Sequence, residues 1–180
     1  MIPQIQHRHN LGSFLLAHGL DTSGVEVGCA FGGLSKMIMD QCGKIKLFMV
    51  DPYARQSPSV YLEEGVEVKP YEQWFKEVSD LPSHGYNCEI IRDYSLEAVK
   101  RFSDGKLDFV YLDGNHARKS VEADIQAWWP KVRSGGLFGG HDYSYVNPWS
   151  DVFGAVTEWT IREQLPFVVC PCTSWFLFKP

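Results

Sequence analysis

The sequence predicts an α/β fold: a mostly parallel sheet with one antiparallel strand near the C-terminus and helices on both faces. Three observations lead to this prediction. Short apolar runs alternate with segments of helical spacing along the 180 residues, which is typical of β–α–β units. The strand-like runs are almost continuously apolar, as expected for strands that are buried on both faces. The last two extended segments have no helix between them, so they must pair in antiparallel fashion.

Start and stop signals delimit the elements of the first half. A helix is predicted over 10–19, with Asn10 as its N-cap and Gly19 as its stop. A turn with three glycines over 28–33 separates the first strand from the second helix. The remaining elements of this half are a strand over 25–27, a helix that ends at Gly43, a strand over 45–50, an irregular polar segment over 53–69 and a helix over 71–78.

The second half contains the most apolar strand, predicted over 107–112, which stops abruptly at Asp113. Val121, Ile125 and Trp128 then recur at helical spacing and mark the buried face of a helix that ends near Pro130. The other predicted elements are a strand over 88–91, a helix over 96–102, a strand over 136–139, a helix over 152–163 and two extended segments over 167–170 and 174–178.

Composition and charge narrow the class of protein. The chain is 44% apolar with a net charge of −5, and it has no basic stripe of the kind that binds nucleic acid. No apolar run approaches the roughly 18 residues of a membrane span, and residues 1–10 do not have the pattern of a signal peptide. Five cysteines without a CxxC pair indicate a reduced, cytoplasmic protein. We expect a single domain over 1–180, without nucleic-acid or membrane partners, and an aromatic content of 14% leaves room for a homodimer interface.

Polar residues follow the ends of the predicted strands. Ligands of open α/β sheets bind beyond the carboxyl ends of the strands, so these side chains are expected at one rim. A single Asp or Asn after a strand is also a common helix N-cap, and this interpretation stays open for each position. Polar groups at five strand ends favour a binding site. In chain order the groups are 26–33, Asp51, 93–95, 113–116 and 141–143.

The first two of these groups are typical of a site for an adenosine-type nucleoside. Glycines at 28, 32 and 33 let the backbone approach a ligand closely and aim free N–H groups at it. Asp51 lies about 20 residues further on, where an acid holds ribose hydroxyls in the dinucleotide-binding fold. The spacing differs from G-x-G-x-x-G. The pattern therefore does not choose between NAD and S-adenosylmethionine.

Five segments together resemble a known family. In chain order they are VEVGCAFGGLS, LFMVDPY, IIRDYSLEAVKRF, LDFVYLDGNH and GGLFGGHDY. They resemble the class I S-adenosylmethionine-dependent methyltransferases, and most closely a bacterial and phage subgroup in which strand four ends in D-G-x-H and strand five in G-H-D-Y. The resemblance covers essentially the whole chain. It implies a Rossmann-like, seven-stranded sheet with an antiparallel C-terminal strand.

The resemblance also implies roles for individual residues. In relatives similar to catechol and sugar or macrolide O-methyltransferases, a divalent metal such as Mg²⁺ or Mn²⁺ is held at the positions of Asp113, His141 and Asp142. A base lies three residues after the strand-four acid, so His116 and Asp113 are the expected catalytic pair. The imidazole of His141 suits Mg²⁺ poorly and could contact the substrate instead. The implied cofactor-binding residues are Glu26, Gly28, Cys29, Phe31, Gly32 and Gly33 at the methionine part, Asp51, Pro52 and Tyr53 at the ribose, Asp93, Tyr94 and Ser95 at the adenine, and Asp113.

The activity implied is O-methylation of a small hydroxylated molecule, such as a sugar or glycan. With an ordinary pKa of about 6.5, His116 would be mostly neutral at pH 7 and able to accept the hydroxyl proton. Two alternatives stay open. An NAD-type oxidoreductase is disfavoured by the glycine spacing and the C-terminal strand pair, and a non-catalytic domain that binds S-adenosylmethionine would keep the fold without the reaction.

Overall fold

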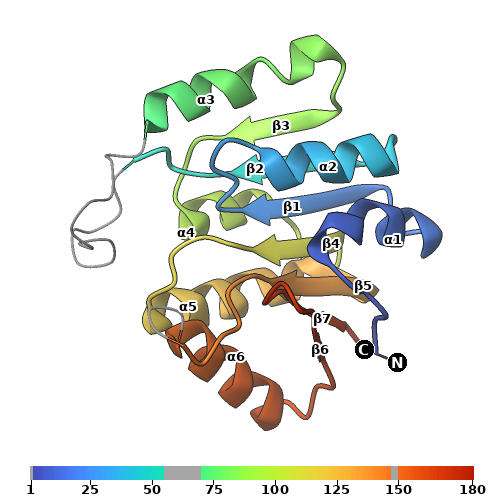
Figure 1. Ribbon diagram of the computed structural model, residues 1–180, viewed down its shortest axis with the longest axis vertical. Coiled ribbons are helices and arrows are strands. Elements are labelled where there is room, and N and C mark those ends of the chain that lie inside the picture. The colour runs from blue at the N-terminus through green and yellow to red at the C-terminus, as the bar shows by residue number, and fades with distance from the viewer. Residues whose placement is uncertain (1, 55–69, 147–149) are drawn as a thin grey trace.

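The computed structural model describes residues 2–54, 70–146 and 150–180. Its strands are β1 Ser23–Val27, β2 Lys46–Val50, β3 Cys88–Ile91, β4 Leu107–Leu112, β5 Val132–Gly140, β6 Val168–Val169 and β7 Trp175–Phe178. They form one seven-stranded sheet in the order β3-β2-β1-β4-β5-β7-β6 (Figure 1). β7 runs antiparallel to both β5 and β6, and the other pairs are parallel. The predicted fold class, a Rossmann-like and mostly parallel sheet with an antiparallel C-terminal strand, is confirmed.

Six α-helices and four short 3-10 turns connect the strands in the described ranges. The helices are α1 Leu11–Ala17, α2 Gly33–Cys42, α3 Tyr71–Ser79, α4 Ser95–Ala98, α5 Arg118–Trp128 and α6 Ser150–Arg162. Asn10 occupies the N-cap position of α1 as predicted, but its side chain makes no capping hydrogen bond. The helix expected over 96–102 is divided into α4 and a 3-10 turn. The segment expected to be irregular was 53–69, and residues 55–69 of it lie outside the described residues.

The core consists of two apolar layers, one on each face of the sheet. β4 is buried along its whole length and sends alternate side chains to the two layers. Phe109 and Tyr111 pack with residues of α1, α2 and α3, whereas Val110 and Leu112 pack with residues of α4, α5 and α6. The helices accordingly cover both faces of the sheet (Figure 1). Such a doubly covered parallel sheet leaves the rims at the strand ends as the places where a ligand can enter.

The arrowheads of β1, β3 and β4 in Figure 1 point to the same side of the molecule, which is the side of the carboxyl ends. The polar groups predicted from the sequence therefore follow the strands on this side. Within the described ranges, no helix is both long and apolar enough to cross a membrane.

Candidate active site

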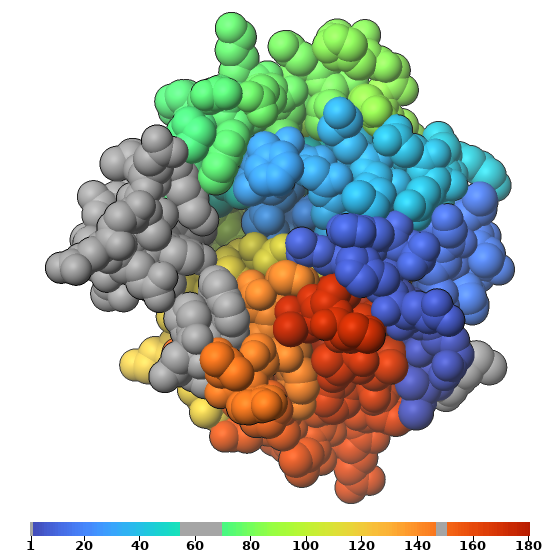
Figure 2. Space-filling model, viewed as in Figure 1, coloured from blue at the N-terminus to red at the C-terminus, as the bar shows by residue number. Residues whose placement is uncertain are grey.

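Three loops lie side by side at one rim of the sheet. The loop after β4 is in the middle, with the loop after β1 on one side and the loop after β5 on the other. Backbone hydrogen bonds continue past the strand ends: the N–H of Asp113 donates to the carbonyl of Val27 (2.7 Å), and that of His141 to the carbonyl of Leu112 (3.0 Å). In Figure 2, yellow atoms, the colour of the chain around the end of β4, are visible between blue atoms of the N-terminal part and orange atoms of the chain around the end of β5. The rim therefore brings residues of distant sequence segments together.

The turn between β1 and α2 has a backbone conformation that requires glycine. Gly28 has a φ of +86°, and a Cβ atom there would lie 2.1 Å from the carbonyl oxygen of Asp113. Gly32, immediately before α2, has a φ of +78°. Glycine alone adopts these conformations without steric cost. The turn predicted from the sequence thus allows the backbone after β1 to touch the loop after β4.

Asp51, at the end of β2, fixes this turn and the loop that follows β2. Its Oδ2 accepts the N–H of Ala30 (3.0 Å), and its Oδ1 accepts the N–H of Tyr53 (2.8 Å). Ala30 and Tyr53 both have positive φ values, +46° and +47°, which residues other than glycine rarely adopt. The carboxylate stabilises both conformations.

A cavity of about 470 Å³ opens beside Gly28 towards α4 and α5. Much of its lining is apolar, and the polar groups include Asp124, a buried acid of α5. A mostly apolar cavity with a few fixed polar groups is typical of a small-molecule or cofactor site. The residues of the predicted cofactor set that line it are Gly28, Pro52, Tyr94 and Ser95.

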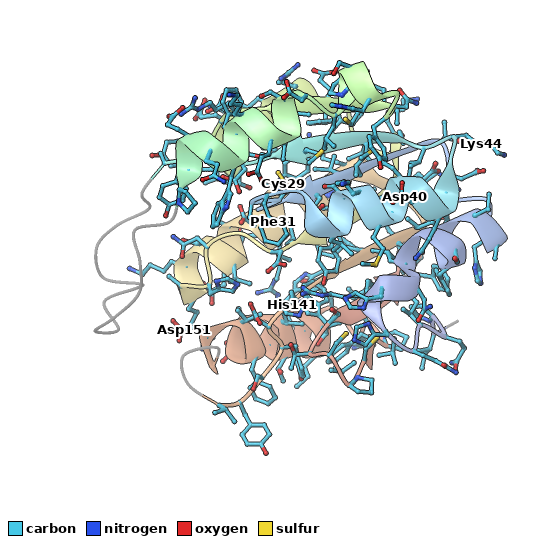
Figure 3. The ribbon with its side chains drawn as sticks, turned by 45° about the horizontal axis from the view of Figure 1, so that its top comes forward. Cys29, Phe31, Asp40, Lys44, His141 and Asp151 are labelled. Carbon is cyan, nitrogen blue, oxygen red and sulfur yellow. The ribbon has the colours of Figure 1, made fainter. Side chains whose placement is uncertain are left out.

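A second cavity, of about 280 Å³, also borders Gly28. Glu26 lies at this cavity, is 2% exposed and accepts a hydrogen bond from the hydroxyl of Ser35. Burial raises the pKa of Glu26 to about 8, although the Ser35 bond acts in the opposite direction. Figure 3 shows Cys29 and Phe31 near the start of α2. The residues of the predicted cofactor set that line this cavity are Glu26, Gly28, Cys29, Phe31, Gly33 and Asp113.

The N-terminal segment adds a cation to the second cavity. Arg8 lines it, and its Nη1 lies 3.5 Å from Oδ2 of Asp113. The backbone N–H of Arg8 donates to Sγ of Cys172 (3.4 Å), which attaches this segment to the loop before β7. The cavity consequently has a guanidinium group at Arg8 and a carboxyl group at Glu26. This charge arrangement suits a zwitterionic ligand.

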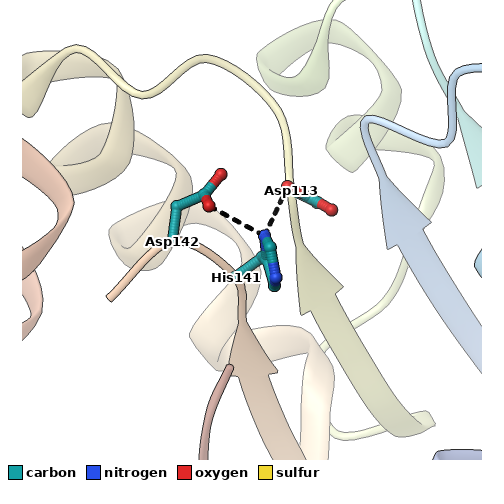
Figure 4. Close-up of side chains that lie close together, drawn as sticks. All are labelled: Asp113, His141 and Asp142. Carbon is teal, nitrogen blue, oxygen red and sulfur yellow. Dashed lines mark ion pairs between the residues drawn. The ribbon is translucent and has the colours of Figure 1, made fainter. Parts of the chain in front are cut away.

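Asp113, His116, His141 and Asp142 form a compact group, which we name the acid–imidazole cluster. Nε2 of His116 lies 2.8 Å from Oδ2 of Asp142 and 3.7 Å from Oδ1 of Asp113. Nδ1 of His141 lies 2.9 Å from Oδ1 of Asp142 and 3.8 Å from Oδ1 of Asp113 (Figure 4). Asp142 has a φ of +58°, a conformation that persists only when the surrounding structure enforces it. The structure therefore assembles all the residues that the sequence suggested for catalysis and metal binding.

The carboxylates of the cluster determine the charge of His116. Burial alone would lower the pKa of His116, but the contacts with Asp113 and Asp142 outweigh it and raise the pKa to about 9. Burial acts to raise the pKa of Asp142, yet its contacts with the two histidines hold it below the usual range. His116 accordingly carries a proton at neutral pH in this arrangement. The expectation of a mostly neutral imidazole was wrong, because it left out two flanking carboxylates.

Three members of the cluster have the arrangement of a metal site. Asp113, His141 and Asp142 each offer a ligand atom, and these atoms lie within 4.8 Å of one another. Two carboxylates and one imidazole suit Mn²⁺, Fe²⁺ or Zn²⁺, whereas Mg²⁺ prefers a complete set of oxygen ligands. The residues present therefore fit a divalent metal, although the histidine makes Mg²⁺ the least suited of these ions.

Four residues of the predicted cofactor set line neither cavity: Gly32, Asp51, Tyr53 and Asp93. Tyr53 is 2% exposed, its hydroxyl lies 3.2 Å from Sγ of Cys29, and its ring packs against Phe75. Asp93 is exposed, and its Oδ1 accepts the N–H of Tyr94 (2.8 Å). Tyr53 therefore supports the glycine turn from within the core, and Asp93 fixes the backbone at the start of α4.

Solved structures with the same fold include several methyltransferases. A putative caffeoyl-CoA O-methyltransferase from Staphylococcus aureus has a TM-score of 0.70 at 12% identity, over 99% of this chain and 86% of its own. The O-methyltransferase NovP has a TM-score of 0.68 at 14% identity, over 96% and 77% of the two chains. The calicheamicin methyltransferase CalS11 has 0.66 at 17% identity, over 96% and 80%. At these identities the likeness shows the fold alone, and no curated protein has a matching sequence.

The sheet order and the glycine turn at its carboxyl rim define a Rossmann-like methyltransferase fold. The sequence profile of the methyltransferase domain family matches residues 25–143. The chain therefore belongs to this family of methyltransferase domains. The narrower resemblance, to the subgroup with D-G-x-H and G-H-D-Y strand ends, stays a prediction.

Sequence reasoning did not identify Arg8 or Asp124 as residues of the two cavities. Arg8 precedes every predicted element, and no spacing in the sequence connects it with the strand ends. Asp124 had a signal, because it falls on the apolar face that Val121, Ile125 and Trp128 define. An acid at an apolar position of a helix is buried on folding, which is unfavourable unless a partner or a ligand satisfies it.

We expect Glu26→Gln to change how the stability of the ligand-free protein depends on pH. A carboxyl whose pKa is raised on folding contributes stability below its unfolded pKa of about 4.5, and this contribution is lost as the pH rises through about 8. Glutamine stays neutral, so the variant should be more stable than the wild type at pH 9 by about 1–3 kcal/mol and close to it near pH 4.5. Urea unfolding at both pH values measures the difference.

Glu77→Gln, which removes an exposed acid of α3, is the matched control and should leave the pH profile unchanged. A Glu26→Gln variant that is less stable than the wild type at pH 9 would show that the charged form of Glu26 is favoured in the folded protein.

Proposed function

We propose that the protein transfers the methyl group of S-adenosylmethionine to a hydroxyl group of a small acceptor, and that the hydroxyl reacts at the acid–imidazole cluster. The observation that carries the proposal is the position of Asp113. It lines the cavity that contains Glu26 and Arg8, and it also contacts both histidines of the cluster. One side chain thus borders the place expected for the methyl donor and the place expected for the acceptor.

Both cavities together accommodate the parts of the methyl donor. The adenine would occupy the cavity of about 470 Å³, and the amino-acid part would occupy the cavity with Arg8 and Glu26. Arg8 would bind the carboxylate through its opposite charge. Glu26 would accept hydrogen bonds from the ammonium group, whose positive charge favours the ionised form of the acid. Asp51 lies at the glycine turn between the strand ends, where its carboxylate would accept hydrogen bonds from the ribose hydroxyls.

S-adenosylmethionine supplies an activated methyl group on a sulfonium sulfur. The task of the chain is to hold the acceptor oxygen in line with this methyl group, a gain of up to about 7–11 kcal/mol from orientation alone. Exclusion of water is favoured by the burial around the cluster. The carboxylates at Asp113 and Asp142 also favour retention of a cationic donor over the neutral product.

His116 is the residue proposed to accept the hydroxyl proton, and it can do so only in its neutral form. With its pKa raised to about 9 by Asp113 and Asp142, the neutral form increases with pH. A divalent cation held by Asp113, His141 and Asp142 would polarise the hydroxyl and offset the carboxylate charges that raise this pKa. The metal and the base therefore belong to one proposal.

A hydroxylated sugar is the acceptor class that we favour. CalS11 is described as a TDP-rhamnose 3′-O-methyltransferase, and its fold covers nearly all of this chain. The second cavity is bordered by Phe31, which is 58% exposed and packs near Trp74, with 6.1 Å between ring centroids. An exposed aromatic ring beside a cavity with charged groups suits a ligand that has both apolar faces and hydroxyl groups.

We expect Arg8→Gln to weaken binding of S-adenosylhomocysteine by about tenfold or more, because a hydrogen bond to a charged group contributes about 1.5–3 kcal/mol. Binding of 5′-methylthioadenosine, which lacks the amino-acid part, should stay the same. Titration calorimetry measures both ligands, and Lys36→Gln, an exposed cation of α2, is the control. Equal losses for both ligands would contradict the carboxylate contact, and binding of NAD in place of S-adenosylhomocysteine would overturn the proposed cofactor.

We expect Asp142→Asn to weaken Mn²⁺ binding by at least about tenfold, because it removes one of two carboxylate ligands. Electron paramagnetic resonance of free Mn²⁺ measures the affinity, and Asp151→Asn, an exposed acid in the first turn of α6, is the matched control. Similar Mn²⁺ affinity in both variants and the wild type would exclude a metal site at the cluster and leave the methyl transfer proposal intact.

Transfer of labelled methyl groups to a panel of sugars, nucleotide sugars and catechols tests the reaction itself. We expect an O-methylated product, with kcat/KM in the absence of added metal rising as the pH increases towards about 9, because His116 must lose its proton. His116→Ala should lower the rate by about 10²–10⁴-fold and abolish this pH dependence. Tight binding of S-adenosylmethionine without transfer to any acceptor would favour a non-catalytic domain.

A further inference from the structure

Asp124 is a buried acid on the apolar side of α5. It shares this face with Val121, Ile125 and Trp128 and is 7% exposed. In the described part of the chain, no Lys, Arg or His forms an ion pair with it, and the burial raises its pKa to about 6 against the opposing effect of its bond with Ser95. A buried carboxyl group without a cation is unfavourable unless hydrogen bonds satisfy it. The packing of α5 does not require an acid at this position.

One oxygen of Asp124 is held in a fixed place by neighbouring side chains. The hydroxyl of Ser95 donates to Oδ1 of Asp124 (2.5 Å), and the indole Nε1 of Trp128 donates to the same hydroxyl (2.8 Å). Because the indole occupies an acceptor site of the Ser95 oxygen, the hydroxyl proton is directed to Asp124. Oδ2 makes no hydrogen bond within the described residues. The carboxylate is thus oriented and has an unused acceptor oxygen.

This carboxylate lines the cavity of about 470 Å³, whose walls include Val27, Val50 and Leu96. Glu97, another acid of the lining, is exposed and pairs with Lys100 at 2.5 Å. A flat base between apolar walls can be distinguished only by the few polar groups that meet its edge. A fixed, buried acceptor is suited to an N–H donor of that edge.

We propose that Asp124 recognises the exocyclic amino group of the adenine, through a hydrogen bond accepted by its carboxylate, and that it thereby selects adenine over purines with an oxygen at this position. The inference rests on the proposed cofactor and its place in the larger cavity. Hypoxanthine presents a carbonyl oxygen where adenine presents an amino group. A carboxylate attracts the amino group and repels the carbonyl oxygen.

The test compares S-adenosylhomocysteine with S-inosylhomocysteine, its hypoxanthine counterpart, by titration calorimetry at pH 8. We expect the wild type to bind the adenine ligand at least about tenfold more tightly, and Asp124→Asn to reduce this ratio by about tenfold, because asparagine can also donate to the carbonyl oxygen. Asparagine can still accept the Ser95 hydrogen bond, so the fold should be retained, and thermal unfolding checks it. The wild type alone provides a second measurement: the unsubstituted purine analogue, which lacks the amino group, should bind about tenfold more weakly than the adenine ligand.

Two variants decide whether the effect belongs to Asp124. Glu97→Gln removes the exposed acid of the same cavity lining. This variant should keep the wild-type ratio of the affinities for S-adenosylhomocysteine and S-inosylhomocysteine. Asp93→Asn removes the acid that the sequence had suggested at the adenine, and the ratio should be retained there as well. Loss of the ratio in Asp93→Asn, or a ratio within about twofold of the wild type in Asp124→Asn, would overturn the inference while S-adenosylhomocysteine binding upholds the cofactor. A wild type that does not bind S-adenosylhomocysteine would overturn the proposed cofactor and this inference with it.

Discussion

The site depends on one close approach of two backbone segments, between Gly28 and Asp113. The N–H of Asp113 bonds to the carbonyl of Val27, and a side chain at position 28 would collide with the Asp113 carbonyl at 2.1 Å. This contact places the turn after β1 directly against the loop after β4. The cavities on either side of Gly28 and the acid–imidazole cluster are consequently parts of one surface. A methyl donor lying over the glycine would present its sulfonium group close to the cluster without any large movement of the chain.

The distribution of charge around this contact follows the chemistry of a cationic donor. Carboxyl groups at Glu26, Asp51 and Asp113 border the expected position of S-adenosylmethionine, and Arg8 supplies a cation at its amino-acid end. Burial of Glu26 opposes its ionisation, so the ligand-free protein is less stable at high pH than its packing alone would allow. A site that buries acids is commonly less stable than an apolar one, and ligand binding compensates for the difference.

The sequence contained enough information for the fold and for the cluster. Strands 88–91 and 107–112 were predicted with the bounds that the structure has, because each is a short apolar run that ends at a polar residue. The rule that parallel strands end at one rim was sufficient to group Asp113, His116 and Asp142. The rule does not supply side-chain orientation. The carboxylate of Asp93, which the family resemblance placed at the adenine, accepts the next backbone N–H and does not line the larger cavity.

The errors on the cluster and the cavities have a common physical origin. The pKa of His116 depends on two carboxylates from different strands, and their distances of 2.8 Å and 3.7 Å exist only in the folded chain. Arg8 reaches the second cavity because its backbone bonds to Cys172, 164 positions further along the chain. The contact of His116 with Asp142 and the bond between Arg8 and Cys172 both join segments that are far apart in the sequence, so no local sequence pattern indicates them. Local patterns predict elements and strand ends, whereas the electrostatic environment of a side chain follows from tertiary packing.

Recognition of the adenine and reaction at the hydroxyl are connected through the loop after β4. Gly114 and Asn115 line the larger cavity and lie between Asp113 and His116 in the sequence. The same segment therefore forms a wall of the proposed adenine site and carries the acid and the imidazole of the cluster. A small shift of this loop, caused by a poorly fitting base, would displace both groups from the acceptor. Because a misplacement of about 1 Å can cost 10²-fold in rate, selection of the correct cofactor and efficient transfer are two consequences of the same rigid turn.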